Sequence, residues 1–212
     1  MEEFQNNPQT KIRKDILGIL NHAKEILNMT YKGFKKHNLE HLEKVKEIEI
    51  KLYKDSNYLI KFLLEARSEE GTRQFLPIPG HFDRIGDGLN ILRASVKKKI
   101  RGDILFSDKS VSEACKLFDE ILELFTCLSD CINTNNRVLA EYINNEGERL
   151  GELVDEYNLS HEERLIAGMC TPKAAPIYLD ILASFEKTLW HIREIAMNVL
   201  TWGGEDREEK SK

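Results

Sequence analysis

The sequence predicts an all-α protein of six long antiparallel helices that form two tandem three-helix bundles. Strong helix formers dominate the 212 residues, and only 5 prolines and 12 glycines interrupt them. Apolar residues also recur at spacings of three and four along nearly the whole chain, which is the period of an amphipathic helix. With 41% hydrophobic and 32% charged residues, the chain is expected to be soluble and folded.

Three helices are expected in the first half, over residues 10–36, 39–68 and 81–101. Asn38 is suited to cap the second of them, which ends in the Glu-Glu-Gly stretch at 69–71. The Leu-Pro-Ile-Pro-Gly segment at 76–80 is expected to be extended, because the residue before a proline avoids the helical region. This segment would separate the second helix from the third.

Three more helices are expected in the second half. The fourth follows Ser107, a good N-cap, and carries apolar residues as far as Ile132. The fifth covers about 137–157, and a separate short turn at 160–163 has the capping-box pattern Ser-His-Glu-Glu. Thr171-Pro172 provides an N-cap and a first-turn proline for the sixth helix, over about 172–201.

The order of helices suggests an internal repeat of about 100 residues. Gly102 would separate a first repeat, residues 1–102, from a second, residues 103–203, and a charged tail would follow at 204–212. An aromatic-acid-base triplet supports the repeat, because Phe-Asp-Arg at 82–84 has a counterpart in Phe-Glu-Lys at 185–187.

The charge is distributed unevenly between the halves. Residues 1–101 hold 20 basic and 14 acidic side chains, whereas residues 102–212 hold 11 and 22. The basic half could face an acidic surface or anionic lipid. Its lysines are interleaved with glutamates and lack interleaved aromatic residues, so we do not expect it to bind nucleic acid.

Several classes of protein are disfavoured. Cys127 and Cys131 lie four residues apart, without the C-x-x-C spacing of zinc or redox sites, so free thiols are expected. We find no signal-peptide pattern and no apolar run near the roughly 18–20 residues that span a bilayer, and we expect a cytoplasmic protein, at most peripheral to the membrane. No nucleotide-binding or hydrolase motif appears, so we do not expect an enzyme.

Four carboxylates stand out by their positions. Glu49 occupies an apolar stripe position between Val45 and Leu52, and Glu146 does the same in the second half. Asp83 and Asp87 lie one helical turn apart, next to an apolar face, so their charges repel unless a cation lies between them. Carboxylates in this arrangement are suited to a hard cation such as Mg, Mn or Fe.

Plain structural interpretations remain open for these acids. Asp83 and Asp87 could form a solvated helix edge beside Arg84, and Glu49 and Glu146 could face a gap or a lysine stem. Gly86 and Gly88 favour a ligand, because glycine inside a helix usually permits a close approach. No histidine follows a glutamate by three residues, which excludes a ferritin-like di-iron oxidase.

The segment 82–87, Phe-Asp-Arg-Ile-Gly-Asp, resembles the E/D-x-x-x-D signature of the PhoU family of phosphate-uptake regulators. The resemblance extends over essentially the whole chain. The chain is similar above all to family members that are fused to sodium/phosphate cotransporters. It includes Leu105-Phe106-Ser107, Arg164 with Gly168, and Tyr178-Leu179-Asp180 leading into Phe185-Glu186. The resemblance implies six antiparallel helices in two three-helix bundles.

The resemblance also implies metal ligands. Asp83, Asp87 and Glu49 match the acids of the family's first site, and Glu186 and Glu146 match acids of the second. Trp190 stands where the second motif has its second acid, so we expect one complete acidic cluster at most, in the first repeat. The implied metal is divalent or ferric: Fe, Mn, Mg or Zn.

The resemblance finally implies a cytoplasmic regulator that binds a phosphate transporter or a sensor histidine kinase and forms a homodimer. One alternative is a metal-binding or storage bundle unrelated to phosphate. Another is a helical adaptor in which the acidic motif has lost its metal.

Overall fold

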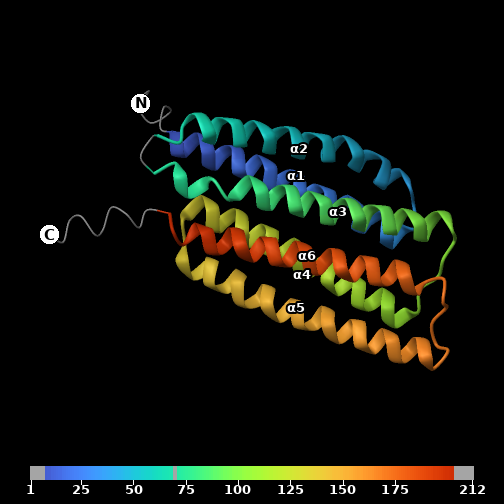
Figure 1. Ribbon diagram of the computed structural model, residues 1–212. Coiled ribbons are helices and arrows are strands. Elements are labelled where there is room, and N and C mark those ends of the chain that lie inside the picture. Colours follow the sequence, from blue (N-terminus) through green and yellow to red (C-terminus); the bar gives the residue numbers. More distant parts are fainter. Residues whose placement is uncertain (1–7, 69–70, 203–212) are drawn as a thin grey trace.

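The computed structural model describes residues 8–68 and 71–202, and it confirms the six-helix architecture (Figure 1). A short 3₁₀ turn, η2 (Arg73–Phe75), precedes the third helix. The six helices are α1 (Pro8–Lys36), α2 (Glu40–Glu65), α3 (Ile78–Arg101), α4 (Asp108–Thr134), α5 (Arg137–Ile166) and α6 (Ala175–Val199).

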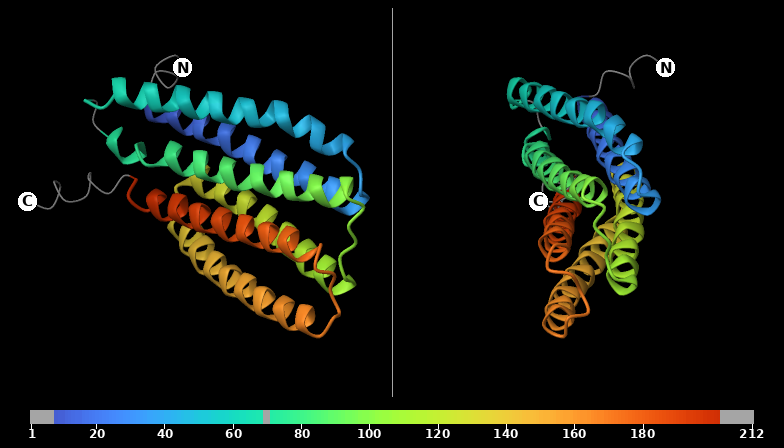
Figure 2. Two further views of the ribbon diagram at one scale, coloured as in Figure 1. Left: turned by 45° about the vertical axis from the view of Figure 1, so that its right-hand side comes forward. Right: turned by 90° about the vertical axis from the view of Figure 1, so that its right-hand side faces the viewer.

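The helices pack as two triplets, which contact each other along their length. Helices α1, α2 and α3 contact one another, and so do α4, α5 and α6. The triplets are joined where α3 packs on α6 and α1 packs on α4, which leaves α2 and α5 at opposite edges (Figures 1 and 2). The boundary predicted near residue 102 falls in the α3–α4 connection, and the tail predicted from 204 lies outside the described residues. The division into repeats at residues 1–102 and 103–203 stays a prediction.

Local signals set most of the helix ends. Asn38 Oδ1 accepts a hydrogen bond from the Glu40 N–H at 2.8 Å, and Ser107 Oγ accepts one from the Ser110 N–H at 3.2 Å. Asn136 caps α5 in the same way, by accepting from the N–H groups of Val138 and Leu139. Each cap satisfies amide groups that the first turn of a helix leaves without partners.

Two sequence predictions about helix limits are wrong. Residues 160–163 are not a separate turn, because α5 continues to Ile166 and buries His161 and Arg164 against its neighbours. The segment 76–80 is not extended, since Pro77 adopts helical angles and α3 already begins at Ile78. Proline is tolerated in this first turn, where its missing N–H would have had no helical partner.

Aromatic rings join the two triplets in the core. The Phe118 ring of α4 stacks on Tyr31 of α1 at 4.6 Å between centroids, and it meets Phe185 of α6 edge-on at 4.8 Å. Phe34 of α1 lies 5.6 Å from the same ring. Phe118 is fully buried, so it connects three helices through a single side chain.

We therefore expect Phe118→Ala to lower the free energy of unfolding by about 3–5 kcal/mol, because it removes the ring and leaves a cavity where three helices meet. Urea unfolding followed by far-UV circular dichroism measures this change. Ile166→Ala is the control, since that side chain is 88% exposed and its loss should change stability by less than about 0.5 kcal/mol. Equal effects of the two substitutions would contradict the packing described.

Candidate functional site

The two aspartates of α3 lie among side chains from α2 and α6. Asp83 Oδ1 accepts a hydrogen bond from Ser56 Oγ at 2.7 Å. Asp87 Oδ1 accepts one from Tyr53 Oη at 3.2 Å, and Asp87 Oδ2 is 3.7 Å from Lys187 Nζ of α6. Arg84 Nη1, 3.6 Å away, adds a second cation beside Asp87. The two carboxylates are therefore already bonded to or paired with side chains of α2, α3 and α6.

Glu49 is buried, as its stripe position predicts, and it is paired within the protein. Its Oε1 is 2.7 Å from Arg93 Nε, and only 7% of the residue is exposed. Tyr53 lies near all three acids of this region. Its burial, and then the neighbouring Asp87 carboxylate with smaller effects of Glu49 and Asp83, raise the pKa of Tyr53 to about 12.

The acids of the second triplet lie differently. Glu146 of α5 accepts hydrogen bonds from Arg149 Nε at 2.9 and 3.0 Å, which lower the pKa of the Glu146 carboxyl. Glu186 of α6 is exposed. The structure thus places Glu49, Asp83 and Asp87 around one tyrosine, and it turns Glu146 toward an arginine of its own helix.

Gly86 and Gly88 of α3 lie close to side chains of neighbouring helices. A Cβ added at Gly86 would lie 3.1 Å from both Leu52 Cδ2 and Tyr53 Oη of α2, and one added at Gly88 would lie 3.2 Å from Thr188 Oγ1 of α6. The close approach predicted from these glycines is present, and its partners are α2 and α6.

Across residues 8–68 and 71–202, no three His, Cys, Asp or Glu side chains gather in a group that could hold a metal ion. Arg93 and Lys187 already compensate the charges of Glu49 and Asp87, so this donor set as it stands is not arranged for a metal. Metal binding by Glu49, Asp83, Asp87, Glu146 and Glu186 stays a prediction.

A groove of about 450 Å³ opens between α5 and α6, and we call it the α5–α6 groove. Its lining includes acidic side chains from both helices and the indole of Trp190, which is 52% exposed. Gly147 and Gly151 of α5 also line it, one turn apart. The groove therefore combines negative charge, an exposed aromatic ring and a low-relief backbone surface.

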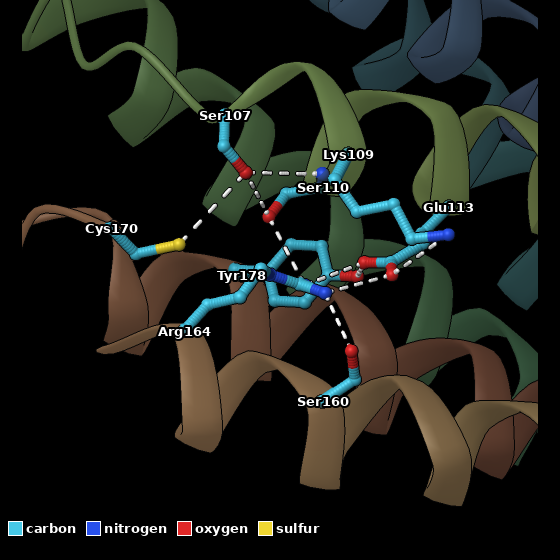
Figure 3. Close-up of polar contacts among 8 residues, drawn as sticks. All are labelled: Ser107, Lys109, Ser110, Glu113, Ser160, Arg164, Cys170 and Tyr178. Carbon is cyan, nitrogen blue, oxygen red and sulfur yellow. Dashed lines mark hydrogen bonds and ion pairs between the residues drawn. The ribbon is translucent and has the colours of Figure 1, made fainter. Parts of the chain in front are cut away.

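A buried polar network connects α4, α5 and α6 (Figure 3). The Glu113 carboxylate, 2% exposed, accepts hydrogen bonds from Arg164 Nη1 at 3.0 Å, from Arg164 Nη2 at 2.7 Å and from Tyr178 Oη at 2.6 Å. Ser160 Oγ accepts another from Arg164 at 2.7 Å. Burial and the bond to Glu113 raise the pKa of the Tyr178 phenol.

The sequence analysis did not single out Glu113, although a signal was present. Glu113 precedes the buried Leu117 by four residues and Leu124 by eleven, so it occupies the apolar stripe of its helix. A small cavity of about 220 Å³ adjoins the network and is lined by Ser107, His161 and Cys170 among others. Both ring nitrogens of His161 are buried without a hydrogen-bond partner.

Two histidines meet where α3 crosses α6. His81 Nδ1 and His191 Nδ1 are 3.1 Å apart, and the His191 ring lies edge-on to Trp190 at 4.6 Å. Burial, followed by repulsion from His81, Lys187 and Arg84, lowers the pKa of His191 to about 4. The neutral imidazole is therefore the form that this site favours.

We expect Arg164→Met to lower the free energy of unfolding by about 3–5 kcal/mol, because it removes the two guanidinium hydrogen bonds of the buried Glu113 carboxylate and leaves only the exposed Lys109 ammonium, 3.9 Å away. Adding Glu113→Leu to this variant should restore part of the loss, since no unpaired charge then remains. Urea unfolding measures both. Glu148→Gln, which removes an exposed partner of Arg193, is the control and should cost less than about 1 kcal/mol. If the double variant were less stable than Arg164→Met alone, the buried ion pair between Glu113 and Arg164 would be contradicted.

The lowered pKa of His191 predicts a loss of stability in acid. Protonation favours the unfolded chain, where the imidazole titrates near 6.5, so stability is complete above that pH and falls as pH drops from 6.5 toward about 4. We expect His191→Gln to reduce the decrease in melting temperature between about pH 7.5 and pH 5. His41→Gln on α2 controls for removing an imidazole, and equal slopes in all three proteins would refute the assignment.

Comparisons with known proteins identify the fold. No protein-family model matches the chain, and no curated protein is significantly similar to it in sequence. Among solved structures, the phosphate transport system regulatory protein PhoU from Streptococcus pneumoniae superposes with a TM-score of 0.79 at 12% identity, over 93% of this chain and 95% of that one. PhoU from Pseudomonas aeruginosa gives 0.79 at 14% identity, over 92% and 96%. The chain therefore has the PhoU fold along nearly its whole length.

Proposed function

We propose that this protein regulates phosphate uptake at the cytoplasmic face of the membrane by binding a phosphate transporter, its sensor histidine kinase, or both. The observation that carries the proposal is the superposition on two PhoU structures, one of them described as a phosphate transport system regulatory protein, over more than nine-tenths of both chains. The segment 82–87 that resembles the family signature lies in α3, where the two triplets meet.

The polar groups support recognition of a partner as the mode of action. Glu113 is hydrogen-bonded to Arg164 and Tyr178 inside the second triplet, and Glu49 is paired with Arg93 beside the first. The groups that remain available to another molecule lie on the outer surface, above all in the α5–α6 groove. Within the described residues, none of the helices has the length and apolar character to cross a bilayer, so a membrane partner would be contacted from outside.

Metal binding is not a step in this proposal. A divalent or ferric ion near Glu49 and Asp87 would have to displace Arg93 and Lys187, whose positive charges already stabilise those carboxylates. For the same reason, no observation favours the alternative of a metal-storage bundle.

The test is in-cell cross-linking of the tagged full chain, grown with high and with low phosphate, followed by mass spectrometry of the captured proteins. We expect a phosphate transporter component or its sensor kinase to be enriched, in an amount that changes with phosphate. Phe118→Ala is a control that destabilises the common core, and it should lower capture. Recovery of the same unrelated proteins under both conditions would reject the proposed function.

A further inference from the structure

The α5–α6 groove exposes a tryptophan that the fold does not use. Trp202, the other tryptophan, is 3% exposed and packs on Phe75 at 4.6 Å between ring centroids. Trp190 is 52% exposed and lines the groove, where its indole lies edge-on to His191 at 4.6 Å and tilted to His81 at 6.1 Å between ring centroids. Large, partly exposed aromatic side chains in a concave surface are the residues on which protein partners most often anchor.

The groove also holds carboxylates that no residue of 8–68 or 71–202 neutralises. Glu152, Asp155 and Glu186 line it, and none of them forms an ion pair or side-chain hydrogen bond with any described residue. The two basic residues of the lining are already engaged, Lys187 with Asp87 and Arg193 with Glu148. The surface thus presents about three uncompensated negative charges around one indole.

The shape of the groove fits a helix. Gly151 of α5 presents bare backbone, since a Cβ added there would meet nothing within 4 Å, whereas Gly147, one turn before it, is covered by the Arg193 side chain of α6. Ala183 adds a small residue from α6. Two adjacent helices with small residues between them leave a channel into which the side-chain ridge of a third helix can pack.

The corresponding region of the first triplet is closed, which makes the second distinctive. There Tyr53 of α2 covers Gly86 of α3, and Arg93 pairs with Glu49. Asp87 is compensated by Lys187. In the second triplet Arg193 covers Gly147 in a similar way, but the surface around Gly151 and Trp190 stays open.

We propose that the α5–α6 groove is a docking site for a helix of a partner protein that carries Lys or Arg residues beside a large apolar side chain. The cationic groups would pair with Glu152, Asp155 and Glu186, and the apolar side chain would pack on Trp190 and over Gly151. This inference rests on the proposed function, because it locates the partner contact of a regulator on one surface. Charge complementarity selects the cationic occupant, since an acidic helix would add like charges to the groove.

The experiment uses Trp190 as its own reporter. The full chain is titrated with an amphipathic helical peptide of Leu and Lys, and in parallel with a Leu and Glu peptide of the same length and pattern. We expect the Lys peptide alone to shift the indole emission to the blue in a saturable manner, and we expect binding to weaken at about 0.5 M NaCl, where screening is strong. Trp190→Phe, which leaves only the buried Trp202, should show no shift.

Matched variants separate the groove from the general acidity of the chain. Neutralising the groove with Glu152→Gln, Asp155→Asn and Glu186→Gln should weaken the Lys peptide about tenfold or more. The control, Glu47→Gln, Glu123→Gln and Asp130→Asn, removes the same charges from exposed positions of α2 and α4 and should change affinity less than about threefold. Circular dichroism confirms that both variants are folded.

Three results would overturn the inference. They are an equal shift with the Glu peptide, an equal loss in the control variant, and a blue shift that grows with protein concentration alone, which would show that a second copy covers the groove. Cellular capture separates this inference from the proposed function. If the groove variant still captures a transporter or kinase, the groove assignment fails and the function stands, whereas phosphate-independent capture by the unmodified chain rejects the function whatever the peptide does.

Discussion

The approach of α3 to α6 is the contact on which the rest of the structure depends. Each triplet buries one stripe of its helices internally, and α3 and α6 bury a larger share of their residues than the other helices do, because they also pack against each other. Gly88 permits this, because a side chain there would press on Thr188 Oγ1 and the Ser184 carbonyl. With α3 and α6 in contact, α1 and α4 are brought together below them, and the two triplets share a single core.

The two triplets have the same architecture and different polar chemistry. Around α2 and α3, acids are paired with cations from neighbouring helices, so the surface is nearly neutral where the family-like motif lies. Around α4 to α6, the one buried acid, Glu113, is compensated internally, and Glu152, Asp155 and Glu186 of the outer face have no ion-pair partner among the described residues. The excess of acidic residues in the second half is therefore largely a property of an outward-facing surface.

Local sequence signals predicted the helices well and their partners poorly. Asn38 and Ser107 cap their helices because a cap needs only neighbouring residues. The capping-box pattern at Ser160 was misleading, because Arg164 reaches Glu113, 51 positions away, and the ion pair keeps this stretch helical. Likewise, the stripe position of Glu49 showed that it would be buried, whereas its pairing with Arg93 depends on how α2 lies on α3. Such pairings are decided by tertiary packing, which periodicity does not describe.

The ends of the helical body have a further consequence. Helix α1 begins and α6 finishes at the same end of the molecule, where the Arg13 guanidinium lies over the Trp202 ring at 4.8 Å (Figure 1). A helical domain whose first and last helices end close together can be inserted into a surface loop of a host domain without disrupting the host fold. The same geometry would allow a circular permutant in which a short linker joins these ends and the chain is opened in the connection between α5 and α6.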